Sequence, residues 1–284
     1  LVLWTKLIQM ETGQKIILKT NNISTSKYEL SIQVNLSGLS FFVLNLETAK
    51  VTFLKALQFD KKQTPKNLLD KLTHSFNTFE ELQNQFSKVT VIHDNELATL
   101  VPKALFDETN LVDYLKFNTK ILKTDFITFD NVQIADLAVV YVPLVNINNF
   151  IFERFGSFEY RHSATVLINR VLTIEKNSKS LKMYVNIETS HFEIITAANN
   201  ALKFYNRFDY NTKEDFIYYL LFTAEQLELN PEEFPIILMG AIDESDERYK
   251  IVYKYIRNVS ILSSDAMLYI NGSNSNHFTL LNSL

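Results

Sequence analysis

Acidic residues gather at one point of the sequence, shortly after an apolar run that ends at Gly240. They are Asp243, Glu244, Asp246 and Glu247. Together with Glu188, these carboxylates could bind divalent cations, because Mg²⁺ and Ca²⁺ prefer oxygen ligands. The same residues also suit the start of a helix, where the helix dipole stabilises negative charge. The sequence leaves both interpretations open, and the helix start is preferred because it needs no ligand.

Other residue types that perform chemistry occur without the spacing of known catalytic sites. The five histidines are His74, His93, His162, His191 and His277. They show no HExxH or paired spacing, and only His93-Asp94 stands out, so structural roles are expected for them. The chain has no cysteine, which excludes disulfides, thiolate nucleophiles and thiolate metal sites. It also lacks the G-x-S-x-G, P-loop and Rossmann glycine motifs.

One ten-residue pattern occurs twice in the chain, at 34–43 and at 185–194. Both copies begin with Val-Asn and an aliphatic residue, and Phe41 and Phe192 stand at the same place in them. Each copy reads as strand-turn-strand and is followed by another apolar strand and an amphipathic helix. Solenoid repeats recur about every 20–50 residues, so the much longer spacing here predicts two similar lobes.

The elements that would position the first copy follow from apolar periodicity. Runs separated by turn residues predict strands at 30–36, 40–46 and 51–59. Thr64-Pro65 suits a helix start, and apolar residues at three- and four-residue spacing carry the predicted helix to Phe86. Further strands are predicted at 89–92, 98–101 and 137–142, and further helices at 111–122, 147–155 and 164–175.

The second half repeats this order of elements. Strands are predicted at 182–187, 191–197, 201–208, 235–239 and 259–262. An approximate capping box from Thr212 to Asp215 predicts a helix that continues to Leu227, and a second helix is predicted at 246–258. The expected domains are an N-terminal tail at 1–27, a first lobe at 28–175, a second lobe core at 181–263 and a C-terminal segment at 264–284.

This duplicated order resembles the actin-like ATPase superfamily, which includes actin, sugar kinases and the heat-shock chaperone ATPases. The resemblance covers about residues 28–263 and lies in element order more than in motifs. It points to a bacterial family of unknown function that has this fold. The fold it implies is α/β, a duplicated actin-like ATPase (ribonuclease H-like) fold of two lobes with a central cleft.

The resemblance also implies which residues would contact a nucleotide. Active members open each lobe with a hairpin that carries Asp-x-Gly-Thr/Ser, in which Asp orients the metal and the turn holds phosphate. Here Asn35 and Asn186 replace that Asp, Glu188 replaces the Gly, and the first copy has its glycine one residue late. The implied nucleotide-binding residues of the two hairpins are Asn35, Ser37, Gly38, Asn186, Glu188, Thr189 and Ser190.

A third element of the resemblance is a Gly-Gly-type turn that approaches adenosine. Gly240-Ala241 is similar to it, with Ala for the second glycine. Small residues there could let the base and ribose pack on the backbone. An equally good interpretation is a glycine that ends a buried strand before a helix.

Because the acidic and glycine positions are altered, the resemblance favours a protein without catalysis or with only weak binding of ATP and Mg. Such a protein would act through an unknown protein partner. Two alternatives remain open. One is an active ATPase or kinase, with Thr189 and Ser190 on phosphate and Glu188 on Mg. The other is a metal-dependent nuclease of the ribonuclease H-like class, which would use the acidic residues described above.

Composition restricts the partners and the location. The net charge is −4 with dispersed Lys and Arg, so no nucleic-acid partner is expected. No apolar run reaches the roughly 20 residues that span a bilayer, and no signal peptide is recognised, which favours a cytoplasmic protein. The aromatic stretch from Phe204 to Phe222 is expected to lie mainly in the core, and its exposed members could contact a partner. The oligomeric state is left open.

Overall fold

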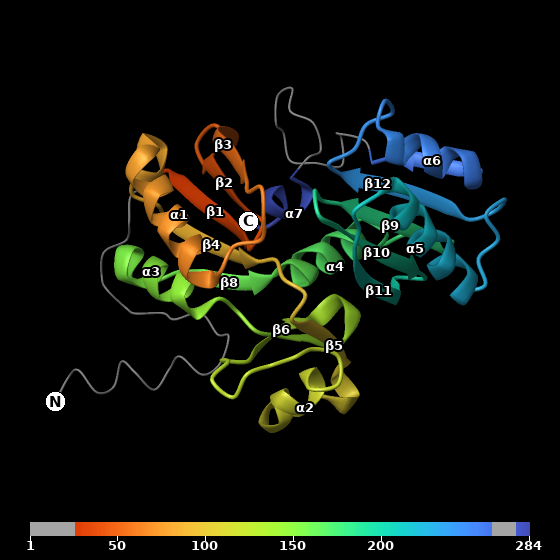
Figure 1. Ribbon diagram of the computed structural model, residues 1–284, viewed down its shortest axis with the longest axis horizontal. Coiled ribbons are helices and arrows are strands. Elements are labelled where there is room, and N and C mark those ends of the chain that lie inside the picture. Colours follow the sequence, from red (N-terminus) through yellow and green to blue (C-terminus); the bar gives the residue numbers. More distant parts are fainter. Residues whose placement is uncertain (1–25, 263–276) are drawn as a thin grey trace. The chain divides into compact units, whose positions relative to one another are not determined.

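The computed structural model describes residues 26–262 and 277–284 (Figure 1). Most of the expected N-terminal tail at 1–27, and much of the expected C-terminal segment at 264–284, lie outside the described residues. The chain splits into two compact units, and the division falls after Val166, inside helix α4 (Ser163–Ile174). Ser283 and Leu284 belong to the first unit.

The first unit contains a five-stranded sheet in the order β3-β2-β1-β4-β8. Its strands are β1 (Tyr28–Asn35), β2 (Gly38–Asn45), β3 (Lys50–Gln58), β4 (Lys88–His93) and β8 (Glu159–His162). Strands β1, β2 and β3 are antiparallel neighbours, whereas β4 runs parallel to β1 and β8 parallel to β4. Alternate residues Leu30, Ile32 and Val34 of β1 face a core that helices α1 (Pro65–Thr78) and α3 (Val145–Phe155) cover.

Helix α1 begins as predicted and ends earlier than predicted. The Thr64 side chain accepts the backbone N–H of Asn67, and Pro65 occupies the first helical position. The helix stops at Thr78 because Phe79 is extended, and a separate 3-10 turn at Glu80–Gln83 continues the chain. The predicted helix as far as Phe86 was therefore wrong in length. Its apolar spacing persists because Leu82, in the 3-10 turn, is buried in the same core.

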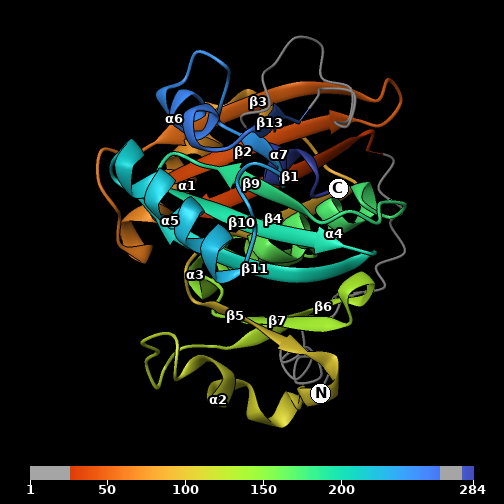
Figure 2. The same cartoon turned by 90° about the vertical axis from the view of Figure 1, so that its right-hand side faces the viewer.

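A small antiparallel sheet in the first unit has the order β5-β7-β6 (Figure 2). Its strands are β5 (Ala98–Pro102), β6 (Thr128–Val132) and β7 (Leu137–Tyr141). Helix α2 (Leu111–Leu115) packs on it through Leu115, so the predicted helix at 111–122 was too long. Strands β6 and β8 were not predicted, because β6 carries Asp and Asn and β8 is largely polar. Single 3-10 turns lie at Lys103–Leu105, Glu108–Asn110 and Gln133–Ala135.

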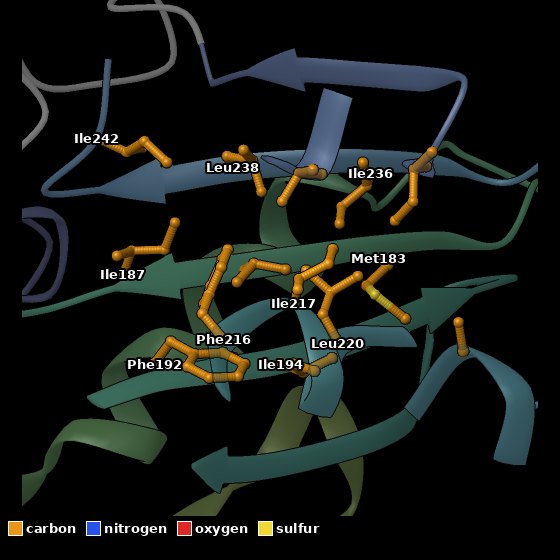
Figure 3. Close-up of a cluster of buried hydrophobic side chains, with 14 of the residues drawn as sticks. Met183, Ile187, Phe192, Ile194, Phe216, Ile217, Leu220, Ile236, Leu238 and Ile242 are labelled. Atoms are coloured by element: carbon orange, nitrogen blue, oxygen red, sulfur yellow. The ribbon is translucent and has the colours of Figure 1, made fainter. Parts of the chain in front are cut away.

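The second unit contains a five-stranded sheet in the order β11-β10-β9-β12-β13. Its strands are β9 (Lys182–Ile187), β10 (His191–Ala198), β11 (Ala201–Asp209), β12 (Pro235–Gly240) and β13 (Asn258–Ile261). Helices α5 (Lys213–Gln226) and α6 (Glu247–Tyr255) pack on the face that presents Met183, Val185 and Ile187. Figure 3 shows Phe216 and Leu220 of α5 inside this core. A short helix α7 (Phe278–Leu281) follows.

The two large sheets have the same topology. In each, three antiparallel strands are followed by two strands that run parallel to the central one. The predicted βββαβαβ order of the second half is confirmed. Helix α6 ends at Tyr255, three residues before the predicted end, so that Asn258 can start β13. None of the helices in residues 26–262 and 277–284 is long and apolar enough to cross a bilayer.

Candidate functional site

The first hairpin turn is closed by its own side chain. Asn35 pairs with Gly38 across the end of the hairpin, which leaves Leu36 and Ser37 as the turn. The Oδ1 atom of Asn35 accepts the backbone N–H of Ser37 at 2.7 Å. The carbonyl of Ser37 accepts the N–H of Phe59 at 2.9 Å. The Ser37 N–H that could hold a phosphate is therefore already bonded within the turn.

A carboxylate that the sequence did not connect with this turn lies beside it. Asp94 directly follows β4, and its Oδ2 accepts Nδ2 of Asn35 at 3.0 Å and Nε2 of Gln33 at 3.2 Å. Asp94 is buried, and its N–H donates to the Val34 carbonyl at 3.0 Å. The His93-Asp94 pair was visible in the sequence. Its closeness to Asn35 was not, because it depends on the parallel register of β4 against β1.

Gly38 has a packing role in this hairpin. A Cβ atom at this position would lie 2.8 Å from the Leu57 carbonyl oxygen of β3. The close approach of β3 therefore explains the glycine without a ligand.

The second hairpin presents its candidate residues at the tip. The N–H of Glu188 donates to the His191 carbonyl at 2.9 Å and closes a turn whose tip is Thr189-Ser190. Thr189 is exposed, whereas Glu188 and Ser190 are half-buried. The Tyr210 hydroxyl donates to the Glu188 carbonyl at 2.8 Å and fixes the turn from the end of β11. The hydroxyls proposed to hold phosphate are thus accessible at the tip.

Asn186 lies one residue inside this hairpin and is completely buried. Its Nδ2 donates to Oε2 of Glu193 on β10 at 3.0 Å and lies 3.4 Å from Oγ1 of Thr279 on α7. Glu193 also accepts the Tyr205 hydroxyl at 2.8 Å. Asn35, which is half-buried, and Asn186 therefore make the same type of contact, in which each amide donates to a buried carboxylate 3.0 Å away.

The structure brings Gly240 and Ala241 next to the second hairpin. Gly240 is paired with Ile187, and the N–H of Ala241 donates to the Ile187 carbonyl at 2.7 Å. A Cβ atom on Gly240 would lie 2.4 Å from that carbonyl oxygen and 2.9 Å from Oδ1 of Asn186. Gly240 also has a φ of +87°, which favours glycine. Both the contact and the conformation require glycine here even without a nucleotide.

Arg248 organises the loop after β12, although no motif in the sequence marks it as a site residue. Its guanidinium binds both carboxylate oxygens of Asp246, at 2.9 and 2.6 Å, the Ala241 carbonyl at 2.6 Å and the Tyr210 hydroxyl at 2.5 Å. These hydrogen bonds lower the pKa of the Asp246 carboxyl. Asp246 is also the N-cap of α6, because it accepts the Arg248 N–H at 2.7 Å. Its role as a helix start is confirmed.

The neighbouring acidic residues are engaged in the same local way. Glu247 forms ion pairs with Lys213 at 3.2 Å and Lys250 at 2.7 Å, and Asp243 accepts the Ser245 N–H at 2.7 Å. Within the described ranges, no three His, Asp or Glu side chains are grouped so that they could hold a metal ion. The acidic stretch therefore gives no support to a two-metal nuclease centre.

Two histidines of the first unit, His93 and His162, are buried. His93 accepts the Leu144 N–H at Nδ1 and contacts Oδ1 of Asn148 through Nε2 at 2.9 Å, so Nε2 carries the proton. Burial lowers the pKa of His93 to about 4. His162 likewise accepts the Ala164 N–H at Nδ1 and contacts the Asn95 carbonyl at Nε2. These contacts give both residues a structural role.

Asp130 is a buried carboxylate at the start of α4. It accepts the His162 N–H at 2.8 Å, the Thr165 hydroxyl at 2.7 Å and the Tyr141 hydroxyl at 3.2 Å. Burial raises the pKa of Asp130 to about 6, although these hydrogen bonds favour the charged form. Strand β6, which carries Asp130, was not predicted, so the sequence offered no signal for this residue.

Solved structures share this fold. A Bacteroides thetaiotaomicron protein with an actin-like ATPase fold and unknown function is 21% identical, with a TM-score of 0.72 over 90% of this chain and 95% of that chain. A chain of the PilM-PilN type IV pilus biogenesis complex is 8% identical, with a TM-score of 0.59 over 90% of this chain and 97% of that chain. The chain thus has an actin-like ATPase fold. No curated protein matches it. The model of the family described as "Protein of unknown function (DUF3822)" matches residues 18–259, and the chain belongs to this family.

Proposed function

We propose that this protein is a non-catalytic actin-like protein, with weak or no nucleotide binding, that acts through contacts with another protein. The observation that carries the proposal is the type of contact that the two hairpin asparagines have in common. Each donates to a buried carboxylate at 3.0 Å, from Asn35 to Asp94 and from Asn186 to Glu193. An aspartate at either position would face that carboxylate with like charge. The asparagines are thus integrated into the fold and do not point a charge at a metal.

Exposed aromatic residues of the second unit support a role in protein contacts. On α5, Tyr218 is 61% exposed and Phe222 is 45% exposed, and their rings stack with centroids 6.1 Å apart. On α6, Tyr253 is 63% exposed and stacks on Tyr249. Aromatic side chains are enriched at the centres of protein interfaces. A chain of the same fold has been solved as part of the PilM-PilN complex, which also supports a protein partner.

The matching strand orders of the two large sheets, and the matching asparagine positions, support an origin by internal duplication. In that history both copies would have replaced the metal-directing aspartate by asparagine.

One observation favours the alternative of an atypical ATPase. The hydroxyls of Thr189 and Ser190 stand at the tip of the second hairpin, next to the half-buried Glu188. In this alternative the two hydroxyls bind phosphate and Glu188 contacts Mg.

Calorimetric titration of the full chain with Mg-ATP, together with a phosphate-release assay, tests the proposal. We expect no phosphate release, and binding that is either absent or weaker than about 0.1 mM, which corresponds to about −5.5 kcal/mol. Turnover that the Glu188→Ala variant loses would support the atypical ATPase and overturn the proposal. Glu225→Ala is a matched control, because it removes an exposed carboxylate on α5, outside the candidate site.

A further inference from the structure

The C-terminal helix α7 lies against the carboxyl ends of β9 and β12 in the second unit (Figure 1). All four of its residues, Phe278–Leu281, are buried. Oγ1 of Thr279 lies 3.4 Å from Nδ2 of Asn186, near the end of β9. The helix also contacts β12, the strand that ends at Gly240.

This position is where a ligand of such a sheet is expected. Open α/β sheets bind ligands outside the carboxyl ends of their parallel strands. The candidate residues Asn186, Glu188 and Gly240 lie at those ends of β9 and β12. Because Thr279 lies directly beside the Asn186 amide, a phosphate oxygen that accepted from Nδ2 would have to displace the Thr279 hydroxyl.

Helix α7 is too short to be stable by itself. It has a single turn, and isolated helices shorter than about 12–15 residues are marginal in water. Its side chains Phe278, Leu280 and Leu281 are at most 2% exposed, and exposing them to water would cost free energy. The contacts of α7 with Asn186 and with β12 are therefore expected to stabilise its helical structure.

We propose that α7 is an internal ligand of the second unit, and that docking of α7 and binding of a nucleoside triphosphate at Asn186 exclude each other. This inference rests on the proposed function, since it attributes weak or absent nucleotide binding to a segment of the chain itself.

The absence of cysteine makes a clean test available in the full chain. In Thr279→Cys the only thiol lies on α7, and because residue 279 is buried it reacts with a maleimide only when α7 becomes exposed. Ala224→Cys, buried in the core of α5, reports global unfolding, and Lys254→Cys, exposed on α6, reports the unhindered reaction. We expect the Thr279→Cys thiol to react more slowly than that of Lys254→Cys and faster than that of Ala224→Cys, and saturating Mg-ATP to accelerate it alone.

The labelled protein provides the second measurement, because a maleimide adduct on residue 279 prevents α7 from docking. If α7 is docked at least nine-tenths of the time, Mg-ATP should bind the labelled protein at least about tenfold more tightly than the unlabelled one. Circular dichroism checks that the labelled chain remains folded, and labelling with the same reagent at Lys254→Cys controls for the adduct.

The outcomes separate this inference from the proposed function. If Mg-ATP binds neither form up to millimolar concentration, the inference is overturned and the proposed function stands. If Mg-ATP binds both forms equally while the residue 279 thiol stays protected, the inference is also overturned. If the unlabelled protein releases phosphate and Mg-ATP accelerates labelling, the proposed function fails and the mutual exclusion is supported.

Discussion

Replacement of Asn186 by Asp would introduce the residue that the resemblance to active actin-like ATPases implies at this place, and we expect it to destabilise the protein. Asn186 is completely buried and donates Nδ2 to Glu193 at 3.0 Å. In Asn186→Asp the donor disappears and a second carboxylate faces Glu193 at the same distance. Two carboxylates so close together cannot both ionise, and the pair holds one proton with a raised pKa.

The magnitude follows from this shared proton. Keeping a carboxyl protonated costs about 1.4 kcal/mol for each pH unit above its ordinary pKa near 3.9, which gives about 5.5 kcal/mol at pH 8 and about 1.5 kcal/mol at pH 5. If the carboxyl introduced at residue 186 instead stays charged, its burial without a cation costs about 3–5 kcal/mol, and this cost limits the loss of unfolding free energy at high pH. We therefore expect a loss of about 4 kcal/mol at pH 8 and about 1.5 kcal/mol at pH 5.

The sign of the pH dependence follows from the raised pKa in the folded state. The variant has its full stability below the pKa that the introduced carboxyl has in the unfolded chain. It loses stability as the pH rises through the higher pKa that this carboxyl has in the folded state. Urea denaturation at pH 5 and pH 8, monitored by circular dichroism, measures both free energies of unfolding. Asn186→Leu is the matched control. It removes the same donor without adding charge and should cost about 1–3 kcal/mol at both pH values.

A double variant tests the pairing directly. In Asn186→Asp with Glu193→Gln, the donor and acceptor are exchanged and one carboxylate remains, so we expect about 2–3 kcal/mol of recovery at pH 8 relative to the sum of the single variants. Asn35→Asp, beside Asp94, should likewise lower the free energy of unfolding more at high pH. The loss should be only about 1–2 kcal/mol, because Asn35 is half-buried. The reasoning is refuted if Asn186→Asp costs no more than Asn186→Leu, or if the double variant shows no recovery.

Two further predictions concern the glycines and the buried titratable groups. Gly156→Ala and Gly240→Ala both place a side chain at positive φ, but nothing lies within 4 Å of the new Cβ at Gly156, whereas a carbonyl oxygen lies at 2.4 Å at Gly240. In urea denaturation we expect about 1 kcal/mol for Gly156→Ala and at least about 3 kcal/mol for Gly240→Ala, and equal costs would contradict the close approach. Between pH 6.5 and 4, the contribution of His93 to the free energy of unfolding falls as the pH falls, because its lowered pKa keeps it neutral in the folded state while it becomes protonated in the unfolded chain. The contribution of Asp130 rises over the same window, because its pKa is raised to about 6 in the folded state. Asp130→Asn should therefore lose up to about 3 kcal/mol over this window while the native protein changes little, and parallel pH profiles would count against both assignments.

Much of the second unit could be predicted from the sequence because its signals are local. Turn residues and apolar runs predicted β9, β10 and β11 to within about a residue, and the Thr212–Asp215 capping box marked the start of α5. The predicted helices that proved too long failed for a different reason. Apolar spacing continues past Thr78, although the chain there forms a 3-10 turn that still buries Leu82. The spacing of apolar residues indicates which side chains are buried, and burial alone does not distinguish an α-helix from a compact turn.

The sequence predicted where both hairpins lie but not what their asparagines contact. The repeated Val-Asn pattern identified the hairpins, and the register of β12 against β9 places Gly240 beside Asn186. The partners Asp94 and Glu193 could not be assigned from the sequence. Asp94 is 59 residues from Asn35, and its carboxylate reaches the hairpin only because β4 is parallel to β1.

The sequence by itself determined that no thiol chemistry can occur in this chain, that a hairpin pattern occurs twice, and that asparagine is the second residue of both copies. These features depend on residue type and local spacing. Only the tertiary structure decided that each asparagine faces a buried carboxylate and that α7 packs on Asn186. These contacts depend on strand register, and those of Asn35 and of α7 join residues that are distant in sequence. Their burial contributes free energy only once the sheet has formed.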